Sequence, residues 1–327
     1  MKALFYILVF ILIATAVWQF FKLLGLTKKE QVATEKENNI NGWLMLGLGG
    51  FIYGLMLYSM FQGRVVLLPR QSASLEGEDI DNLFVITMGL ILVVQFITQF
   101  LIYFFTFKYR GIKGRKAMFF ADSHKLEMWW TVTPTIVLSV LIIYGLYTWN
   151  NVQDLSDAEN PLIVEVYAKQ FQWEARYAGA DNELGIGHVN FIKGINTMGV
   201  DMSDKRSADD IPVRELHLPK GRKVIFKFRS QDVMHSAYMP HFRAQINCVP
   251  GMTTSFGFTP TVTTAEMREN EDTKAKFEAI NELRESNGKD PVEFDFLLLC
   301  NKICGSSHYN MQMKVVVEEE ADFNKWL

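Results

Sequence analysis

Charge is scarce in this chain, and in four places it is missing altogether. Of its 327 residues, 21% are charged and 49% are hydrophobic. The uncharged runs hold 19 residues or more and lie at 3–21, 43–61, 82–107 and 128–153. The chain also lacks any C-x-x-C-H sequence, which excludes a covalently attached haem c. We find no internal repeat and no low-complexity segment, so a repeat architecture is excluded.

The uncharged runs predict four membrane-spanning helices. A helix rises about 1.5 Å per residue, so about 20 apolar residues cross a hydrocarbon core of about 30 Å. Buried helices of a soluble domain are the alternative, but four such runs before residue 154 favour a membrane. We therefore expect two helices in 1–80, a transmembrane helical hairpin in 81–153, and a domain outside the membrane in 154–327.

The loop between the third and fourth runs is strongly basic. Residues 108–125 contain six Lys or Arg residues, and basic loops are usually cytoplasmic. The C-terminal domain, one span later, is then expected outside the cytoplasm, and four spans place the N-terminus outside as well. The first run could instead be a cleaved signal peptide. Its removal would leave three spans and contradict the basic loop, so we expect this run to be retained.

The C-terminal part of the chain is acidic, unlike the rest. Residues 151–327 hold 20 basic and 27 acidic residues, a net charge of −7, whereas 1–150 have a net charge of +4. An acidic domain suits a basic protein partner. It argues against nucleic acid as a partner.

Short apolar stretches separated by turn sequences predict a β-rich C-terminal domain. The expected strands are 162–167, 213–218, 223–228, 294–299 and 311–317. This pattern predicts a Greek-key β-barrel or sandwich behind the membrane helices. Two insertions interrupt the pattern, a Gly-, Asn- and Asp-rich loop at 178–210 and an amphipathic helix at 264–288. The expected apolar side of that helix consists of Met267, Phe277, Ile280 and Leu283.

A cluster of metal-binding residue types follows the fourth of these strands. Cys300, Cys304, His308 and Met311 form a C-x3-C-x3-H-x2-M motif. Thiolate, imidazole and thioether are the ligands that copper prefers. A second imidazole is needed, and His235, in a loop after the strand at 223–228, is the best candidate. These residues can hold two copper ions bridged by both thiolates, an arrangement suited to electron transfer.

Other roles for the cysteines remain open at this point. Cys300 and Cys304 could form a disulfide, because they face an oxidising compartment. A disulfide, however, gives no reason for His308 and Met311 at metal-ligand spacing. Cys248 is expected to be an unpaired buried thiol. His241 is a minor alternative to His235 as a ligand.

Four segments together resemble subunit II of the haem–copper cytochrome c oxidases, which holds the dinuclear copper centre CuA. Cys300–Met311 is similar to the copper-binding loop of that family, and Asp232–Ser236 to the segment that provides its first histidine. Gln170–Trp173 resembles the aromatic stretch of the family, and Glu127–Pro134 the start of its second helix. The resemblance covers 80–327 apart from the two insertions, so the first two helices are extra.

The resemblance implies a cupredoxin-like Greek-key barrel anchored by the hairpin. It implies that two copper ions bind to His235, Cys300, Cys304, His308, Met311 and the backbone carbonyl of Lys302. Electrons would pass from a cytochrome c or haem c domain to CuA and then to haems in subunit I. There oxygen is reduced to water, coupled to proton translocation. This subunit would not be active alone.

The resemblance also points to residues outside the copper ligands. Glu127 corresponds to the acid at the mouth of a proton-uptake path, although a solvated surface acid is the alternative. Phe171 stands where the family often has the tryptophan that accepts the incoming electron. Trp173 or Tyr309 could take that role, or all three aromatic residues could have only packing roles.

Two departures from the family pattern concern magnesium. Lys302 replaces the glutamate that helps to bind magnesium at the subunit boundary, and Asn247 stands where an acid is common. An ammonium group cannot bind a cation, so magnesium is doubtful.

The expected partners are subunit I, other oxidase subunits and the lipid bilayer. The extra helices or the insertions could also contact another respiratory complex. We expect a bacterial inner membrane, with the copper domain on the periplasmic side.

Three other functions fit this sequence less well. A quinol oxidase subunit shares the barrel but lacks the cysteines and the methionine that this chain keeps. A membrane-anchored copper chaperone or storage protein would more often expose Met- or His-rich tracts around a mononuclear site. Nitrous oxide reductase shares the copper loop, but this chain has no room for its second copper domain.

Overall fold

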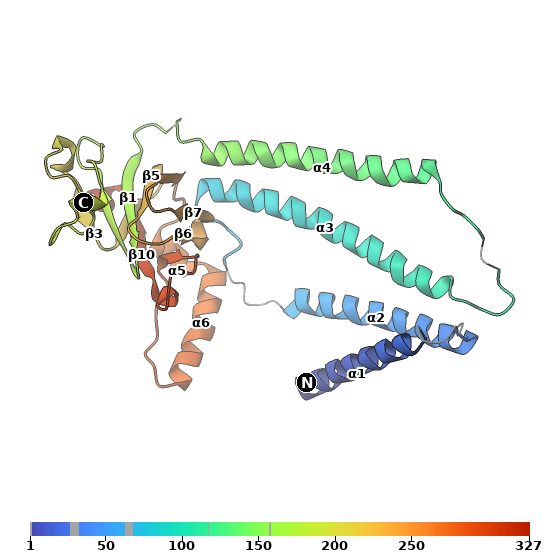
Figure 1. Ribbon diagram of the computed structural model, residues 1–327. Coiled ribbons are helices and arrows are strands. Elements are labelled where there is room, and N and C mark those ends of the chain that lie inside the picture. The colour runs from blue at the N-terminus through green and yellow to red at the C-terminus, as the bar shows by residue number, and fades with distance from the viewer. Residues whose placement is uncertain (1, 27–32, 63–67, 117, 157) are drawn as a thin grey trace. The chain divides into compact units, whose positions relative to one another are not determined.

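The computed structural model describes the chain except residues 1, 27–32, 63–67, 117 and 157. Within the described part, four long helices precede a β-rich domain (Figure 1). Three of these helices are long and apolar enough to cross a membrane, whereas the described apolar part of the first, Tyr6–Lys22, is shorter. A first span therefore stays a prediction. The helices are α1 (Lys2–Leu26), α2 (Glu35–Gln62), α3 (Leu75–Lys108) and α4 (His124–Gln153).

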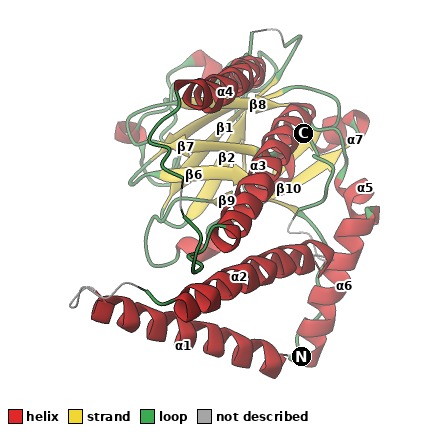
Figure 2. Ribbon diagram, turned by 90° about the vertical axis from the view of Figure 1, so that its right-hand side faces the viewer, coloured by secondary structure: helices red, strands yellow, loops and turns green. Residues whose placement is uncertain are grey.

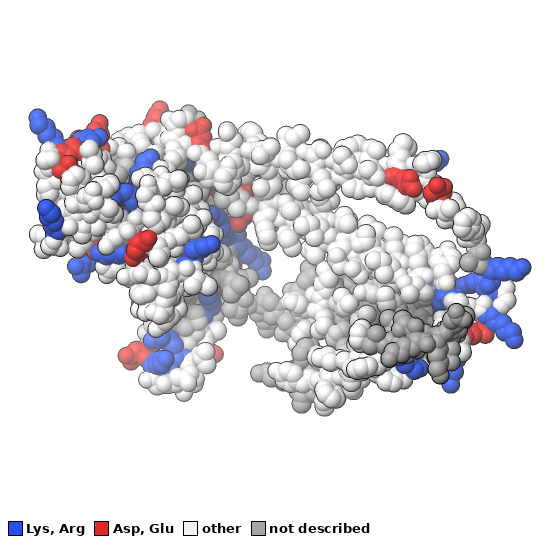
Figure 3. Space-filling view, viewed as in Figure 1, with Lys and Arg blue, Asp and Glu red and all other residues white. Residues whose placement is uncertain are grey.

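Charged side chains are confined to the ends of the spanning segments. The middle part of α4 is free of Lys, Arg, Asp and Glu in the space-filling view, whereas such residues are frequent on the β-rich domain (Figure 3). Polar caps begin two of the helices. The Thr34 side chain accepts from the backbone of Glu37 before α2, and the Ser123 side chain accepts from that of Leu126 before α4. These capping side chains satisfy amide groups that each helix would otherwise leave unpaired.

Helix α2 packs against the C-terminal half of α3. The Tyr53 hydroxyl donates to the Phe96 carbonyl at 2.7 Å, and the two rings are stacked with centroids 5.2 Å apart. Gly49 faces Tyr103, and a Cβ atom at this position would lie 2.6 Å from the Tyr103 ring. Glycine therefore permits the close approach of the two helices, as small residues commonly do in membranes.

The β-rich domain consists of two five-stranded sheets, which are yellow in Figure 2. One has the strand order β3-β2-β1-β5-β8 and the other β4-β10-β9-β6-β7. Most neighbours are antiparallel, but β1 and β5 are parallel, as are β4 and β10. The strands are β1 (Leu162–Lys169), β2 (Gln172–Tyr177), β3 (Ile211–Val213), β4 (Leu216–Pro219), β5 (Val224–Ser230), β6 (His235–Met239), β7 (Ala244–Cys248), β8 (Thr254–Phe258), β9 (Phe296–Cys300) and β10 (Gln312–Glu318).

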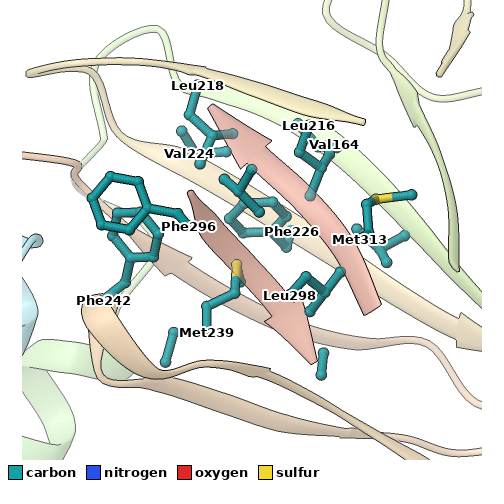
Figure 4. Packing of buried hydrophobic residues seen from close by; sticks show 14 of the residues in the cluster. Val164, Leu216, Leu218, Val224, Phe226, Met239, Phe242, Phe296, Leu298 and Met313 are labelled. Carbon is teal, nitrogen blue, oxygen red and sulfur yellow. The ribbon is translucent and has the colours of Figure 1, made fainter. Parts of the chain in front are cut away.

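Apolar side chains from both sheets form one core. Val164 and Phe226 from the first sheet lie close to Leu298 and Met313 from the second (Figure 4). These four side chains are buried. Burying a large apolar side chain stabilises a fold by about 1.5–3 kcal/mol, so this shared core holds the two sheets together. The predicted fold class, membrane helices followed by a Greek-key β-barrel, is confirmed.

A short segment before α3 is built into the β-rich domain. Ser74 is fully buried, and its hydroxyl donates to the Phe242 carbonyl at 2.7 Å. In the first turns of α3, Asp81 accepts hydrogen bonds from two nitrogens of Arg243, and Glu76 pairs with Lys223 at 2.6 Å. The start of α3 is thus fixed to the barrel by burial and by ion pairs.

A row of charged side chains joins the 178–210 insertion to the first sheet. Arg176 in β2 is 1% exposed and pairs with Glu165 in β1 at 2.6 Å. Arg176 also pairs with Asp210 and donates to the Gly185 carbonyl at 2.6 Å, both within the insertion. Arg229 in β5 donates to Glu165 from the other side. The insertion is therefore held to the sheet by buried ion pairs. It contains two short helices, η1 (Val189–Phe191) and η2 (Lys205–Ser207).

Several local predictions differ from the structure. The strand expected at 213–218 is two strands, β3 and β4, which belong to different sheets. The helix expected at 264–288 is two helices, α5 (Thr264–Glu269) and α6 (Glu271–Ser286), because the side chain of Asn270 caps the second. Leu283 is 66% exposed, so the prediction that it lies on the packed apolar side of this helix was wrong. Met267 is buried, and Phe277 packs against the core. A further helix, α7 (Glu320–Trp326), was not predicted.

Candidate metal centre

Strand register brings the candidate ligands to one end of the second sheet. Strand β6 lies between β7 and β9, with Ala237 opposite Cys300. His235, the first residue of β6, is therefore close to the last residue of β9. It was expected in a loop, and the structure places it at the start of a strand instead. Cys304, His308 and Met311 lie in the loop that joins β9 to β10.

The six candidate donor atoms form a continuous group. The Cys300 and Cys304 sulfurs lie 3.9 Å apart. On one side, Cys300 Sγ is 3.8 Å from His235 Nδ1 and 3.2 Å from the carbonyl oxygen of Lys302. On the other, Cys304 Sγ is 3.7 Å from His308 Nδ1 and 3.8 Å from the sulfur of Met311. The two thiols are thus central, and each has one imidazole and one weaker donor beside it.

These separations fit a shared metal site. Donor atoms that bind a tetrahedral ion at roughly 2.0–2.3 Å lie roughly 3.3–3.8 Å from one another. Among the described residues, His235, Cys300 and Cys304 are the one group of His, Cys, Asp or Glu side chains that could hold a metal ion. Two thiols, two imidazoles and a thioether are a soft donor set that copper prefers. The residues present therefore fit copper.

The disulfide alternative does not match the geometry. A disulfide bond is about 2.05 Å long, whereas these sulfurs are 3.9 Å apart and both cysteines are free. Cys248 lies opposite His235 on β7, is buried, and is also free. Burial raises the pKa of the Cys248 thiol to about 12, so it is an unreactive neutral thiol.

Asp232 contacts Nε2 of His235, the ring nitrogen that does not face Cys300. This role was not predicted from the sequence. The Asp232 carboxylate lies 2.8 Å from His235 Nε2, and His235 is 0% exposed. Burial would raise the pKa of Asp232, but hydrogen bonds from His235, Gln170 and Val233 hold that pKa below its usual range. An ionised Asp232 accepts a hydrogen bond from the Nε2–H of His235 and leaves Nδ1 free to face Cys300. The signal available in the sequence was an acid three residues before the histidine.

Copper binding is expected to release at least one proton at neutral pH. Burial, followed by the neighbouring Cys300 thiol, raises the pKa of Cys304 to about 11, so this thiol is protonated without metal. The ligand is the thiolate, and the apparent affinity should rise at least about tenfold per pH unit below that pKa. Anaerobic titration calorimetry with Cu(I) at two pH values one unit apart measures this effect. Equal affinities would contradict it.

The predicted aromatic residues lie at different distances from the ligands. The Trp173 ring is buried and meets the His235 ring edge-on, with centroids 6.2 Å apart. Phe171 packs on the site loop, where a Cβ atom at Gly305 would lie 2.8 Å from its ring. Tyr309 is 85% exposed. Trp173 is thus the one of the three with a ring contact to a candidate ligand.

The other side chains singled out in the sequence lie apart from the donor atoms. The Lys302 side chain is exposed, and Asn247 lies in β7 with its carbonyl accepting from Thr254. Glu127 is in the first turn of α4, with one carboxylate oxygen 3.5 Å from His124. His241 packs edge-on against Phe294 and Phe296, and it is not among the gathered donor atoms. Burial lowers the pKa of His241 to about 4.

These features define a class, a membrane-anchored β-barrel with a thiolate-rich copper site at one end. Comparison with known proteins is more specific. The protein-family model for the cytochrome C oxidase subunit II transmembrane domain matches residues 65–147. The alternative cytochrome c oxidase subunit 2 of Bradyrhizobium diazoefficiens is 32% identical over 223 residues, 68% of this chain and 69% of that protein. The chain therefore belongs to the cytochrome c oxidase subunit 2 family, and it is a membrane-bound subunit of an oxidoreductase.

Other relatives are more distant. The cytochrome c oxidase subunit 2 of Thermostichus vulcanus is 24% identical over 284 residues, 80% of this chain and 77% of that protein. A solved structure of the periplasmic domain of subunit II of cytochrome oxidase from Bradyrhizobium japonicum has 19% sequence identity and a TM-score of 0.32. It covers 53% of this chain and 94% of that one.

Proposed function

We propose that this chain is the electron-accepting subunit of a terminal oxidase, with two copper ions bridged by Cys300 and Cys304. The observation that carries the proposal is the central position of the two sulfurs, each with an imidazole beside it. Copper held by these residues would supply one-electron redox chemistry. The chain's own residues bind the ions, keep water from His235 and Met311, and hold the donor atoms at fixed separations.

The proposed route begins with a cytochrome c or a haem c domain and ends at haems in the catalytic subunit. Trp173 is the favoured aromatic residue on the input side, because its ring meets that of the ligand His235. Phe171 and Tyr309 remain alternatives for this role. In this proposal, oxygen reduction to water and proton translocation belong to the catalytic subunit.

Three further assignments are part of the same proposal. Lys302 would contribute its carbonyl oxygen to copper, whereas its ammonium group cannot bind magnesium. Glu127, half-exposed at the start of α4, would lie at the mouth of a proton-uptake path. The barrel would face the periplasm of a bacterial inner membrane. The extra helices α1 and α2 would contact other oxidase subunits or a second respiratory complex.

Copper content and the EPR spectrum of the purified full-length chain, loaded with copper and oxidised by one electron, test the proposal. Two coppers per chain with the unpaired electron shared equally over both nuclei is the expected result. One copper with a four-line spectrum would instead favour a copper-binding module without electron transfer. A chain that holds no copper and contains a Cys300–Cys304 disulfide would instead indicate a copper-free subunit of the quinol oxidase type.

A further inference from the structure

The turn between β1 and β2 meets both of the loops that carry the candidate copper ligands. This turn consists of Gln170 and Phe171, between Lys169 and Gln172. One ligand loop precedes His235 and contains Asp232, and the other joins β9 to β10. The two loops are far apart in sequence, so contacts made by a third segment can decide how closely they approach. The backbone of the first loop is already tied to β1, since the Gln231 amide donates to the Ala168 carbonyl at 2.9 Å.

The first contact runs through Asp232. The backbone N–H of Gln170 donates to one carboxylate oxygen of Asp232 at 2.8 Å. The other oxygen accepts from His235 Nε2, also at 2.8 Å. The turn therefore fixes the orientation of the carboxylate, and through the carboxylate the orientation of the imidazole ring.

The second contact runs to the cysteine loop. The side-chain amide of Gln170 donates a hydrogen bond to the backbone carbonyl of Cys304. The next residue, Gly305, has φ of 144°, and a Cβ atom there would lie 2.8 Å from the Phe171 ring and 2.9 Å from the Gln170 amide nitrogen. Only glycine lets the cysteine loop come this close to the turn. The close approach of the cysteine loop to the turn therefore follows from the backbone of that loop and does not depend on the position of one side chain alone.

We propose that Gln170 is a positioning residue that ties the His235 loop to the cysteine loop and so sets the spacing of the copper ligands. The inference rests on the proposed copper function. Among the described residues, the hydrogen bonds of Gln170 run to the Asp232 carboxylate and the Cys304 carbonyl and not to a side-chain donor atom. Gln170 acts through Asp232 on one side and through the Cys304 carbonyl on the other. Partners of this kind orient metal ligands, and removing one commonly weakens metal binding by about 10–100-fold.

The position of Gln170 makes the inference testable without unfolding the protein. Gln170 is exposed at the surface, so truncating it removes nothing from the core. Gln170→Ala removes the amide that reaches Cys304 but keeps the backbone N–H that reaches Asp232. Gln170→Glu keeps the shape but replaces the donor by a carboxylate, which cannot donate to a carbonyl. Gln172→Ala is the matched control, because Gln172, the first residue of β2, is exposed next to the turn and makes neither contact.

The experiment measures the rate of copper release from the loaded full-length chain to an excess of a Cu(I) chelator. The EPR hyperfine pattern and the melting temperature of the metal-free chain are measured for the same variants. We expect Gln170→Ala and Gln170→Glu to release copper about tenfold faster than the unmodified chain, with altered hyperfine splitting and unchanged metal-free melting. Gln172→Ala should match the unmodified chain in all three measurements.

Two results would overturn the inference while leaving the copper function intact. One is an unmodified chain with two coppers and a Gln170→Ala variant with the same release rate and spectrum. The other is faster release accompanied by a lowered melting temperature of the metal-free chain, which would show only a general structural role. An unmodified chain that holds one copper or none would remove the proposed function, and this inference with it.

Discussion

Replacing Cys300 by serine is expected to abolish the proposed copper pair and electron transfer through this subunit. Cys300 Sγ lies beside the other thiol, an imidazole and the Lys302 carbonyl, so it is a donor that both ions would share. A serine hydroxyl is a poor ligand for copper compared with a thiolate. Loss of an outer-sphere partner already costs about 10–100-fold in affinity or activity, so loss of a shared ligand should cost at least about 100-fold.

Copper per chain and the rate of cytochrome c oxidation by the assembled oxidase measure this effect. Cys248→Ala is the control, because Cys248 is a buried free thiol outside the gathered donor group. It should keep both the copper and the rate. A Cys300→Ser protein that still held two coppers with a shared unpaired electron would show that Cys300 is not a bridging ligand.

Replacing Arg176 by methionine is expected to cause the largest loss of stability in the β-rich domain. The guanidinium group is 1% exposed and pairs with both Glu165 and Asp210. Its removal leaves two buried carboxylates with one fewer partner and the Gly185 carbonyl without its donor. Breaking a buried ion pair from one side typically costs about 3–5 kcal/mol, because the remaining charge cannot be solvated.

Denaturant unfolding of the detergent-purified chain, followed by near-ultraviolet circular dichroism, measures this change. Arg206→Met is the matched control within the same insertion, since Arg206 pairs with Asp204 at the surface. Surface ion pairs contribute little to stability, so the control should leave the unfolding midpoint unchanged. A loss below about 1 kcal/mol for Arg176→Met would mean that water reaches the carboxylates and that the insertion is not held by these pairs.

Local patterns in the sequence predicted which residues of the loop between β9 and β10 would lie close together. Cys300, Cys304, His308 and Met311 lie within 12 residues, so the short connection alone forces them to be close together. The membrane helices were predicted for a similar reason, since an uncharged run is a property of consecutive residues. The helical insertion at 264–288 was partly predicted, but its division at Asn270 depends on a capping hydrogen bond that periodicity does not reveal.

Residues distant in sequence were harder to place. His235 was a candidate because its residue type was needed, but its position at the start of β6 depends on the pairing of Ala237 with Cys300. The ion pairs that hold the 178–210 insertion involve β1, β2 and β5, and each partner alone resembles an ordinary surface charge. For this reason the insertion was expected to be a simple surface loop.

The sequence by itself determined the donor types of the loop between β9 and β10 and the apolar helices that can cross a membrane, because both depend on residues that are neighbours in the chain. The tertiary structure decided which outer residues control the site. Asp232 contacts the ligand His235, and Gln170 contacts both Asp232 and the carbonyl of Cys304. Gly305 lies against the turn that contains Gln170 because of the way the loops pack together. Such contacts depend on strand register and sheet packing, which many different sequences can produce and no short pattern encodes.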